Sequence, residues 1–176
     1  MFCLYIVGVK DYTYICITIK TNDMNKANDK DFEINNKVVT VALNKFSKVE
    51  ITSLLNASTD NKDRQKKAQV LIDYLCGKFN MPKSNVNVLE KNQKHTLTTR
   101  GTLKSVTFGD YNTMSKEIRV WNLTAAKGQT VSINQFLNTL LHEFVHHYDM
   151  TYLKYRQSPH TSGFYKRLGD ISAKLK

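Results

Sequence analysis

Hydrophobic residues between positions 133 and 153 recur at the three- and four-residue spacing of an α-helix. They are Ile133, Phe136, Leu137, Leu140, Leu141, Phe144 and Tyr148. Ser132 precedes them and Gln135 follows it by three positions, which is the pattern of an N-terminal capping box. The pattern predicts a long helix over 133–153 with one broad apolar stripe. At about 100° per residue, His142 and His146 fall roughly opposite this stripe, so we expect both to face a cleft.

A second packed helix is predicted from residue 58 onward. Three candidate N-cap residues come first, Ser58, Thr59 and Asp60. Apolar residues then recur at helical spacing, namely Val70, Leu71, Tyr74 and Leu75. The same segment carries a basic run, formed by Lys62, Arg64, Lys66 and Lys67. We interpret this run as a solvated face of the helix rather than a binding site.

Three short segments with partial alternation of apolar and polar residues predict strands: 85–90, 102–111 and 116–123. Gly, Asn and Ser residues separate them, and we expect one turn from Gly109 to Ser115. The natural arrangement is an antiparallel meander. His95 lies in a polar segment between the first two strands, and we interpret it as an ordinary surface residue. Helices with a small, mainly antiparallel sheet predict an α+β fold.

The N-terminal part of the chain differs in composition from the rest. Residues 4–20 are rich in β-branched and aromatic residues and indicate strand structure, while residues 20–37 are polar and typical of a mobile connection. Met24 offers a second possible start of translation. Residues 1–23 are therefore either an upstream extension or an edge hairpin, and the sequence leaves both open. Residues 24–176 are expected to form a single domain.

Charge and cysteine content add two expectations. Lys and Arg outnumber Asp and Glu by 26 to 15, and the net charge of +11 favours an anionic partner such as nucleic acid. The lysines are scattered, however, so solubility explains the charge equally well. Three distant cysteines without a C-x-x-C pair predict a reducing, cytoplasmic environment. The apolar residues 2–9 are too few for a membrane span, so we expect neither a signal peptide nor an anchor.

His142 and His146 are four residues apart, with Glu143 between them. On a helix, two such imidazoles point the same way and can share one zinc ion at a Zn–N distance of about 2.0–2.1 Å. Glu143 then projects beside the ion, where it can accept a proton from a zinc-activated water and pass it to a leaving amine. A catalytic zinc site needs three protein ligands, and His160 is the remaining downstream histidine. These residues predict a zinc-dependent peptidase with Glu143 as general base.

Residues near the motif have predicted supporting roles. His147 rotates back towards the apolar stripe, which indicates packing rather than metal binding. Asp149 lies on the side of His146 and could accept a hydrogen bond from a ligand imidazole. Four tyrosines are near enough in sequence to be candidates for stabilising an oxyanion: Tyr148, Tyr152, Tyr155 and Tyr165.

The segments "HEFVH" and "HTSGF" resemble the motifs of the SprT-like zinc metallopeptidases, which include the Spartan-type proteases. That family places H-E-x-x-H on a helix, then a third histidine in H-G-x-x-F, then a second helix, here "YKRLGDISAKL". The resemblance covers roughly residues 85–176. It implies that residues 24–176 form a zincin-like domain, that His160 is the third ligand, and that an edge strand pairs with extended substrate.

Two features depart from the family. Thr161 stands where the family usually has glycine, and no cysteine-rich zinc ribbon follows His160 in this sequence. Spartan-type members cleave proteins bound or crosslinked to DNA, so the resemblance also implies DNA-associated substrates. Together with the charge, it predicts weak, sequence-independent contact with DNA. A protein or peptide substrate is expected in either case, with no membrane partner, and the oligomeric state is left open.

Two alternatives remain. The chain could be a nucleic-acid-associated binding module whose zinc site is structural or weakly active, although Glu143 favours an enzyme. It could also be a dedicated processing peptidase resembling the ImmA/IrrE group, which typically uses an acidic third ligand. Replacing His160 would discriminate between this group and the SprT-like pattern.

Overall fold

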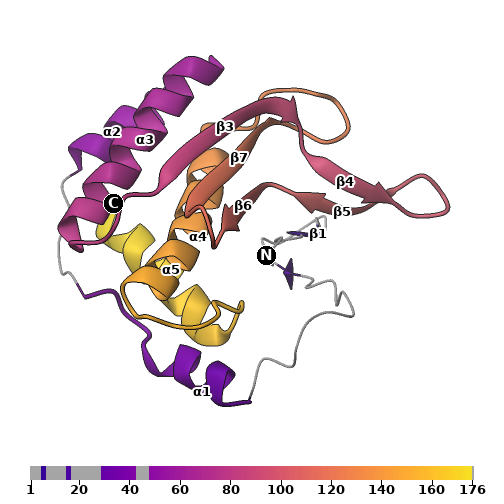
Figure 1. The fold of residues 1–176 in the computed structure, drawn as a ribbon. Helices are drawn as coiled ribbons and strands as arrows, with labels where there is room; N and C mark the ends of the chain where they lie inside the picture. Colours follow the sequence, from indigo (N-terminus) through magenta and orange to yellow (C-terminus); the bar gives the residue numbers. More distant parts are fainter. Residues whose placement is uncertain (1–4, 7–14, 17–28, 43–47, 176) are drawn as a thin grey trace.

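The computed structural model describes residues 5–6, 15–16, 29–42 and 48–175 (Figure 1). In chain order its elements are β1 (Tyr5–Ile6), β2 (Ile15–Cys16), α1 (Asp29–Lys37), α2 (Val49–Leu55), α3 (Asn61–Lys78), β3 (Asn85–Asn92), β4 (Lys94–Leu97), β5 (Leu103–Thr107), β6 (Gly109–Asn112), β7 (Glu117–Leu123), α4 (Ile133–Thr151) and α5 (Ser162–Leu175). Helices and small sheets occur together, so the predicted α+β class is confirmed.

The described strands form two sheets. One has the order β3-β7-β6, and the other has the order β2-β1-β5-β4. β3 pairs in parallel with β7, whereas β6 pairs antiparallel with it and forms an edge of the sheet. β4 and β5 form an antiparallel hairpin that extends away from the helices (Figure 1).

The antiparallel meander predicted for 85–90, 102–111 and 116–123 is wrong. The first and last of these segments run parallel, because the chain leaves this sheet after β3, forms the β4–β5 hairpin in the other sheet and returns at β6. The middle segment is two strands in different sheets, β5 and β6, separated at Phe108. Gly109 consequently lies in β6, and the turn covers residues 113–116. His95 is exposed as expected, but it lies in β4 rather than in a loop.

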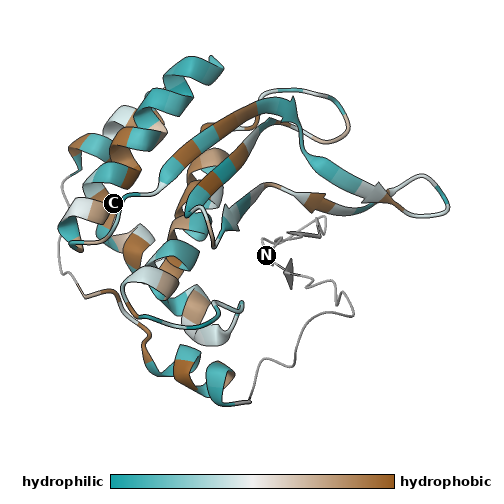
Figure 2. Ribbon diagram, in the orientation of Figure 1, coloured by the Kyte–Doolittle hydropathy of each residue, from teal (hydrophilic) through white to brown (hydrophobic). Residues whose placement is uncertain are grey.

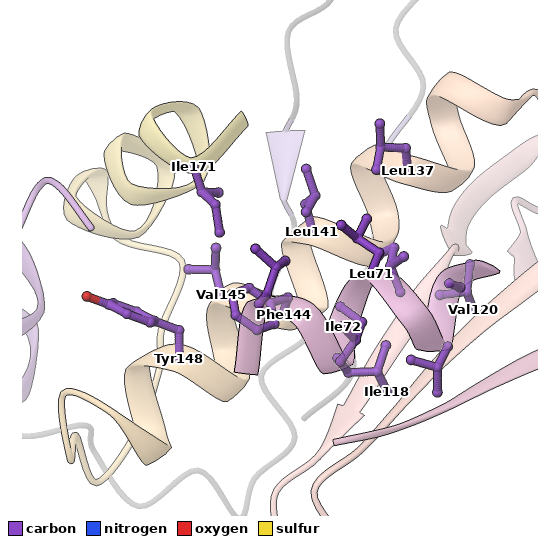
Figure 3. Packing of buried hydrophobic residues seen from close by; sticks show 14 of the residues in the cluster. Leu71, Ile72, Ile118, Val120, Leu137, Leu141, Phe144, Val145, Tyr148 and Ile171 are labelled. Carbon is purple, nitrogen blue, oxygen red and sulfur yellow. The ribbon is translucent and has the colours of Figure 1, made fainter. Parts of the chain in front are cut away.

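Side chains from α3, β7, α4 and α5 meet in one hydrophobic core (Figure 3). Among its members are Leu71, Ile72, Ile118, Val120, Leu141, Phe144, Val145 and Ile171. Hydrophobic and hydrophilic residues alternate along β3 and β7, while β4 is mostly hydrophilic (Figure 2). Helix α4 is therefore held between the three-stranded sheet and α5, which fixes the directions of its side chains.

Local sequence signals place the starts of two helices correctly. The side chain of Asp60 accepts a hydrogen bond from the Asp63 N–H and caps α3. The Ser132 hydroxyl accepts from the Gln135 N–H and caps α4, which ends at Thr151, two residues before the predicted end. Both starts follow from the preference of short polar side chains for the N-cap position.

Residues 29–37 and the side chain of Arg64 differ from what the composition of their segments predicts. Residues 29–37, which we expected to belong to a connection, form α1, while residues 17–28 lie outside the described part of the chain. Arg64, which we expected on a solvated face, is only 3% exposed. Its guanidinium donates to Asn122 Oδ1 at 2.8 Å and to the Val131 carbonyl at 2.7 Å. Arg64 therefore holds α3 against the segment that leads into α4.

Four residues of the N-terminal segment are described. β1 pairs antiparallel with β2, and Tyr5 lies opposite Val106 of β5. The two alternatives for residues 1–23, and the single domain over 24–176, stay predictions, because the other residues before Asp29 lie outside the described ranges. None of the described helices combines the length and apolarity that crossing a membrane requires.

Candidate metal centre

Three histidine rings from two parts of the chain converge on one point. His142 and His146 lie one turn apart on α4, and His160 lies in the loop between α4 and α5. The Nε2 atom of His160 is 2.8 Å from Nε2 of His142 and 3.0 Å from Nε2 of His146. Among the His, Cys, Asp and Glu side chains of the described residues, these three lie close enough together to hold a metal ion. The structure thus brings the three predicted ligand residues together.

The spacing of these nitrogens fits a small metal ion. Tetrahedral zinc with Zn–N distances of about 2.0–2.1 Å separates its ligand nitrogens by about 3.3 Å. The observed separations of 2.8 and 3.0 Å are shorter, so small ring rotations suffice to admit an ion. Imidazole also suits copper, iron and nickel, and the geometry therefore indicates a metal site without fixing the metal.

A buried hydrogen-bond chain determines which nitrogen of His146 faces the cluster. Arg167 donates from Nε and Nη2 to the two carboxylate oxygens of Asp149, at 2.8 and 2.7 Å. Burial raises the pKa of Asp149, but this two-bond pairing keeps the carboxyl ionised at neutral pH. Ser158 Oγ donates to Asp149 at 2.7 Å, so its oxygen accepts from His146 Nδ1 at 3.0 Å. The proton therefore resides on Nδ1, and the Nε2 lone pair is available to a metal.

Asp149 is more deeply buried than predicted, but it is still linked to a ligand imidazole by hydrogen bonds. From the sequence, Asp149 was either an acceptor on the cleft side of α4 for a ligand imidazole or an ordinary Asp on the helix surface. It is instead fully buried, and it reaches His146 through Ser158. Sequence reasoning missed Ser158 and Arg167. One sequence signal could have indicated Arg167: it lies on the apolar face of α5, between Phe164 and Ile171.

Two of the three candidate ligand rings, those on α4, are buried and neutral. His142 and His146 are 2% and 3% exposed, and burial, together with the neighbouring histidine rings, lowers the pKa of both well below its ordinary value. Neutral imidazole is the form that binds a metal. Phe164 covers both rings, at centroid distances of 4.9 and 4.7 Å. Helix α5 thus covers this face at His146, whereas at His142 the predicted cleft is present, because His142 lines a cavity between α4 and α5.

His147 has a separate environment on the other side of α4. Its Nε2–H donates to the Pro82 carbonyl at 2.8 Å, and its Nδ1 accepts from the Tyr111 hydroxyl at 2.9 Å. Burial lowers the pKa of His147, so the ring is neutral. Both ring nitrogens are engaged with the sheet side of the protein, which confirms the predicted packing role.

Glu143 lies on the same turn as His142 and is 1% exposed. Strand β6 passes over it at Gly109, where a Cβ atom would lie 3.0 Å from Glu143 Cγ and 2.6 Å from Thr139 Cγ2. Real Cβ atoms essentially never approach so closely, so glycine is required at this crossing. The predicted general base is thus buried on the turn that carries His142, beneath the edge strand.

One of the four candidate tyrosines contacts the histidine cluster. The ring of Tyr165 stacks on His160, with a centroid distance of 6.1 Å. The hydroxyls of Tyr148 and Tyr155 hydrogen-bond to main-chain groups in α1 or shortly after it. Tyr152 stacks on Tyr148. Tyr165 alone of the four remains a candidate for a role at the site.

The loop that carries His160 is fixed by Thr161 and Gly163. Thr161 Oγ1 accepts from the Phe164 N–H at 3.2 Å and so caps the start of α5. The Gly163 N–H donates to Asn36 Oδ1 at 2.8 Å, and a Cβ atom at 163 would overlap the Asn35 carbonyl oxygen. Glycine at 163, the second residue of α5, is therefore required by the close approach of α1. Thr161 is compatible with a His160 that reaches the other two histidines.

The resemblance to SprT-like peptidases gains nothing from comparisons with known proteins. No protein-family model, curated protein or solved structure matches this chain. The case for a function therefore rests on the residues of the site and on the groups that surround them.

Proposed function

We propose that this chain is a zinc-dependent peptidase of the SprT-like kind, with three histidine ligands and Glu143 as general base. The ligands are His142, His146 and His160. One observation carries the proposal: three imidazole nitrogens converge beside the helical turn that also bears a buried glutamate. Structural zinc sites are closed by four protein ligands, whereas three leave a position for water or substrate. This favours an enzyme over a binding module with a structural metal.

The position of β6 supports the same proposal. An extended peptide that adds to the outer edge of β6 would run past Glu143, and its main chain would be fixed by strand pairing. Gly109 keeps the distance between strand and helix short at this crossing. This placement of the helix beneath an edge strand supports the zincin-like arrangement that the resemblance implies.

Glu143 performs the proton transfers of the proposed reaction. A bound zinc ion would supply a Lewis acid that polarises the peptide carbonyl and acidifies the attacking water. The Glu143 carboxylate takes one proton from that water while the water oxygen bonds to the carbonyl carbon. It then delivers this proton to the amide nitrogen, and the C–N bond breaks. The second proton of the water also passes to the leaving nitrogen, so that a carboxylate and an ammonium group are released. Burial of Glu143 keeps bulk water from competing for these protons.

Metal content and casein cleavage, measured together on three proteins, test the proposal. We expect one zinc per chain and cleavage for the wild type. Glu143→Gln should keep the zinc and lose cleavage, because an amide cannot accept the proton. His160→Ala should lose both zinc and cleavage. A wild type that keeps zinc without cleaving any substrate would support the binding module instead, and absence of zinc after metal-replete purification would reject the metal site.

DNA-associated substrates form a separate part of the proposal, supported by the net charge of +11. Contact with phosphates releases counterions, so affinity for DNA should fall by orders of magnitude between about 50 and 200 mM salt if six or more phosphates are neutralised. Titration with labelled single- and double-stranded DNA at both salt concentrations measures this. If no binding appears at the lower concentration, the charge serves solubility alone.

A further inference from the structure

A cavity of about 320 Å³ lies between α4 and α5. Its walls include Thr139, His142, Tyr165, Leu168, Gly169 and Ser172. It follows α4 towards the helix N-terminus from His142, which places it on the opposite side of that residue from His146. It is thus a separate space that begins at one of the metal-site histidines.

Two residues join this cavity to the metal centre. His142 belongs to the histidine cluster and also forms part of the cavity wall. Tyr165 stacks on His160 and lines the cavity as well. Successive residues of an extended peptide are about 3.3 Å apart along the strand. The side chain of a residue next to a peptide bond held at the cluster can therefore reach into the cavity.

The residues that line the cavity disfavour a charged substrate side chain. None of the described residues that line the cavity is an acid, a lysine or an arginine, although 23% of the chain is charged. A charged side chain placed there would lose its hydration without gaining an opposite charge. The Leu168 side chain and the Tyr165 ring instead offer apolar surface. A volume of about 320 Å³ is at the low end of ligand pockets, which suits a single side chain better than a cofactor.

We propose that this cavity is the pocket for one uncharged, apolar substrate side chain, such as Leu or Phe, beside the scissile bond. This assignment rests on the proposed peptidase function. Gly169 sets the size of the pocket, because it lines the wall and a Cβ atom added there meets no other atom within 4 Å. A larger side chain at 169 therefore has space to occupy the pocket without displacing the fold.

Gly169→Leu is the test, with Gly169→Ala as a milder variant. Gly77→Leu is the matched control, because Gly77 is also an exposed helical glycine with open space around its Cβ position, but it lies in α3. Each zinc-loaded protein is assayed with peptides that differ at one residue beside the cleaved bond. We expect wild type and Gly77→Leu to favour Leu and Phe over Asp and Lys at least about tenfold in kcat/KM. Gly169→Leu should lose about tenfold on the Leu and Phe peptides and less on an Ala peptide, with Gly169→Ala in between.

A binding measurement separates the pocket from the chemistry. The same substitutions are made in the Glu143→Gln background, and the binding of labelled Leu and Asp peptides is followed by fluorescence anisotropy. We expect tighter binding of the Leu peptide and loss of that preference with Gly169→Leu. Gly169-dependent binding without cleavage by the wild type would support the pocket and reject the peptidase. Cleavage with an unchanged preference in Gly169→Leu, or a preference for Asp or Lys, would overturn the pocket and leave the peptidase standing.

Discussion

The two sides of helix α4 place adjacent histidines in different chemical environments. On the side of the sheet, His147 uses both ring nitrogens, one with the Tyr111 hydroxyl and one with the Pro82 carbonyl. On the side of α5, His146 uses Nδ1 with Ser158 and directs Nε2 towards His160. Both rings are buried and neutral. What differs is the partner of the second nitrogen.

This difference shows how one structural device can serve two purposes. A buried hydrogen bond to one ring nitrogen fixes the tautomer of a neutral histidine. On the sheet side a second hydrogen bond uses the remaining lone pair, and the ring contributes to stability. On the α5 side that lone pair points at two other imidazoles, and the ring becomes a candidate ligand. Substitutions at four positions test the comparison, in order of expected effect.

The largest expected effect is the loss of the Arg167 guanidinium. Arg167→Met leaves the Asp149 carboxylate buried without its ion-pair partner, and both side chains are 0% exposed. Breaking such a pair costs about 3–5 kcal/mol in the free energy of unfolding. Urea unfolding followed by circular dichroism measures the change. Arg156→Met, at an exposed position nearby, is the control and should stay within about 0.5 kcal/mol of wild type. A loss below 1 kcal/mol for Arg167→Met would show that the pair does not support the loop.

Tyr111→Phe disturbs only the sheet side of α4. It removes the donor to Nδ1 of His147 and leaves that buried acceptor unsatisfied, at a cost of about 1–3 kcal/mol in unfolding free energy. Zinc affinity should not change, because His147 belongs to the packed side. Unfolding in urea and competition with a chelating dye measure the two quantities. Tyr152→Phe, at a more exposed tyrosine, serves as control. Weaker zinc binding in Tyr111→Phe would contradict the separation of the two sides.

Ser158→Ala disturbs only the α5 side. It interrupts the chain from Asp149 to His146, so the imidazole is no longer held as the Nδ1–H tautomer. Losing such a supporting bond typically weakens metal affinity by about 10–100-fold. The chelator competition used for Tyr111→Phe measures it. Ser162→Ala is the control, because its hydroxyl bonds to Asn36 rather than to a histidine. An unchanged zinc affinity in Ser158→Ala would mean that the hydrogen-bond chain does not orient His146.

The parts of this structure that the sequence predicts depend on neighbours in the chain. Ser132 and the apolar repeat that follows it determine α4 locally, and the i, i+4 spacing of His142 and His146 follows from that helix. His160 could be chosen by elimination, because few histidines remained. Predicting these features requires no knowledge of the tertiary contacts.

The parts that the sequence does not predict depend on contacts between residues far apart in the chain. The parallel pairing of β3 with β7 follows from how residues 93–108 leave the sheet and return to it at β6, and alternation within a strand carries no such information. Arg167 donates to the main chain of α1, 132 residues away in sequence, at the Asn35 carbonyl. Arg64 likewise satisfies a carbonyl 67 residues away, at Val131. A charged residue on a helix gives no sign from sequence alone that the fold will bury it.

The smallest expected effect concerns Thr161, where the chain departs from the SprT-like pattern. Its hydroxyl accepts from the Phe164 N–H at the start of α5, and replacing an N-cap threonine by alanine typically costs about 1 kcal/mol. Glycine at an N-cap typically costs only a few tenths of a kcal/mol. Thr161→Gly should therefore unfold close to wild type, Thr161→Ala should be less stable, and both should bind zinc as wild type does. Urea unfolding and chelator competition on the two variants measure this.

If Thr161→Gly loses as much stability as Thr161→Ala, the packing of the threonine methyl group holds the His160 loop, and glycine and threonine are not interchangeable there. If both variants lose zinc, the loop belongs to the metal site as closely as Ser158 does.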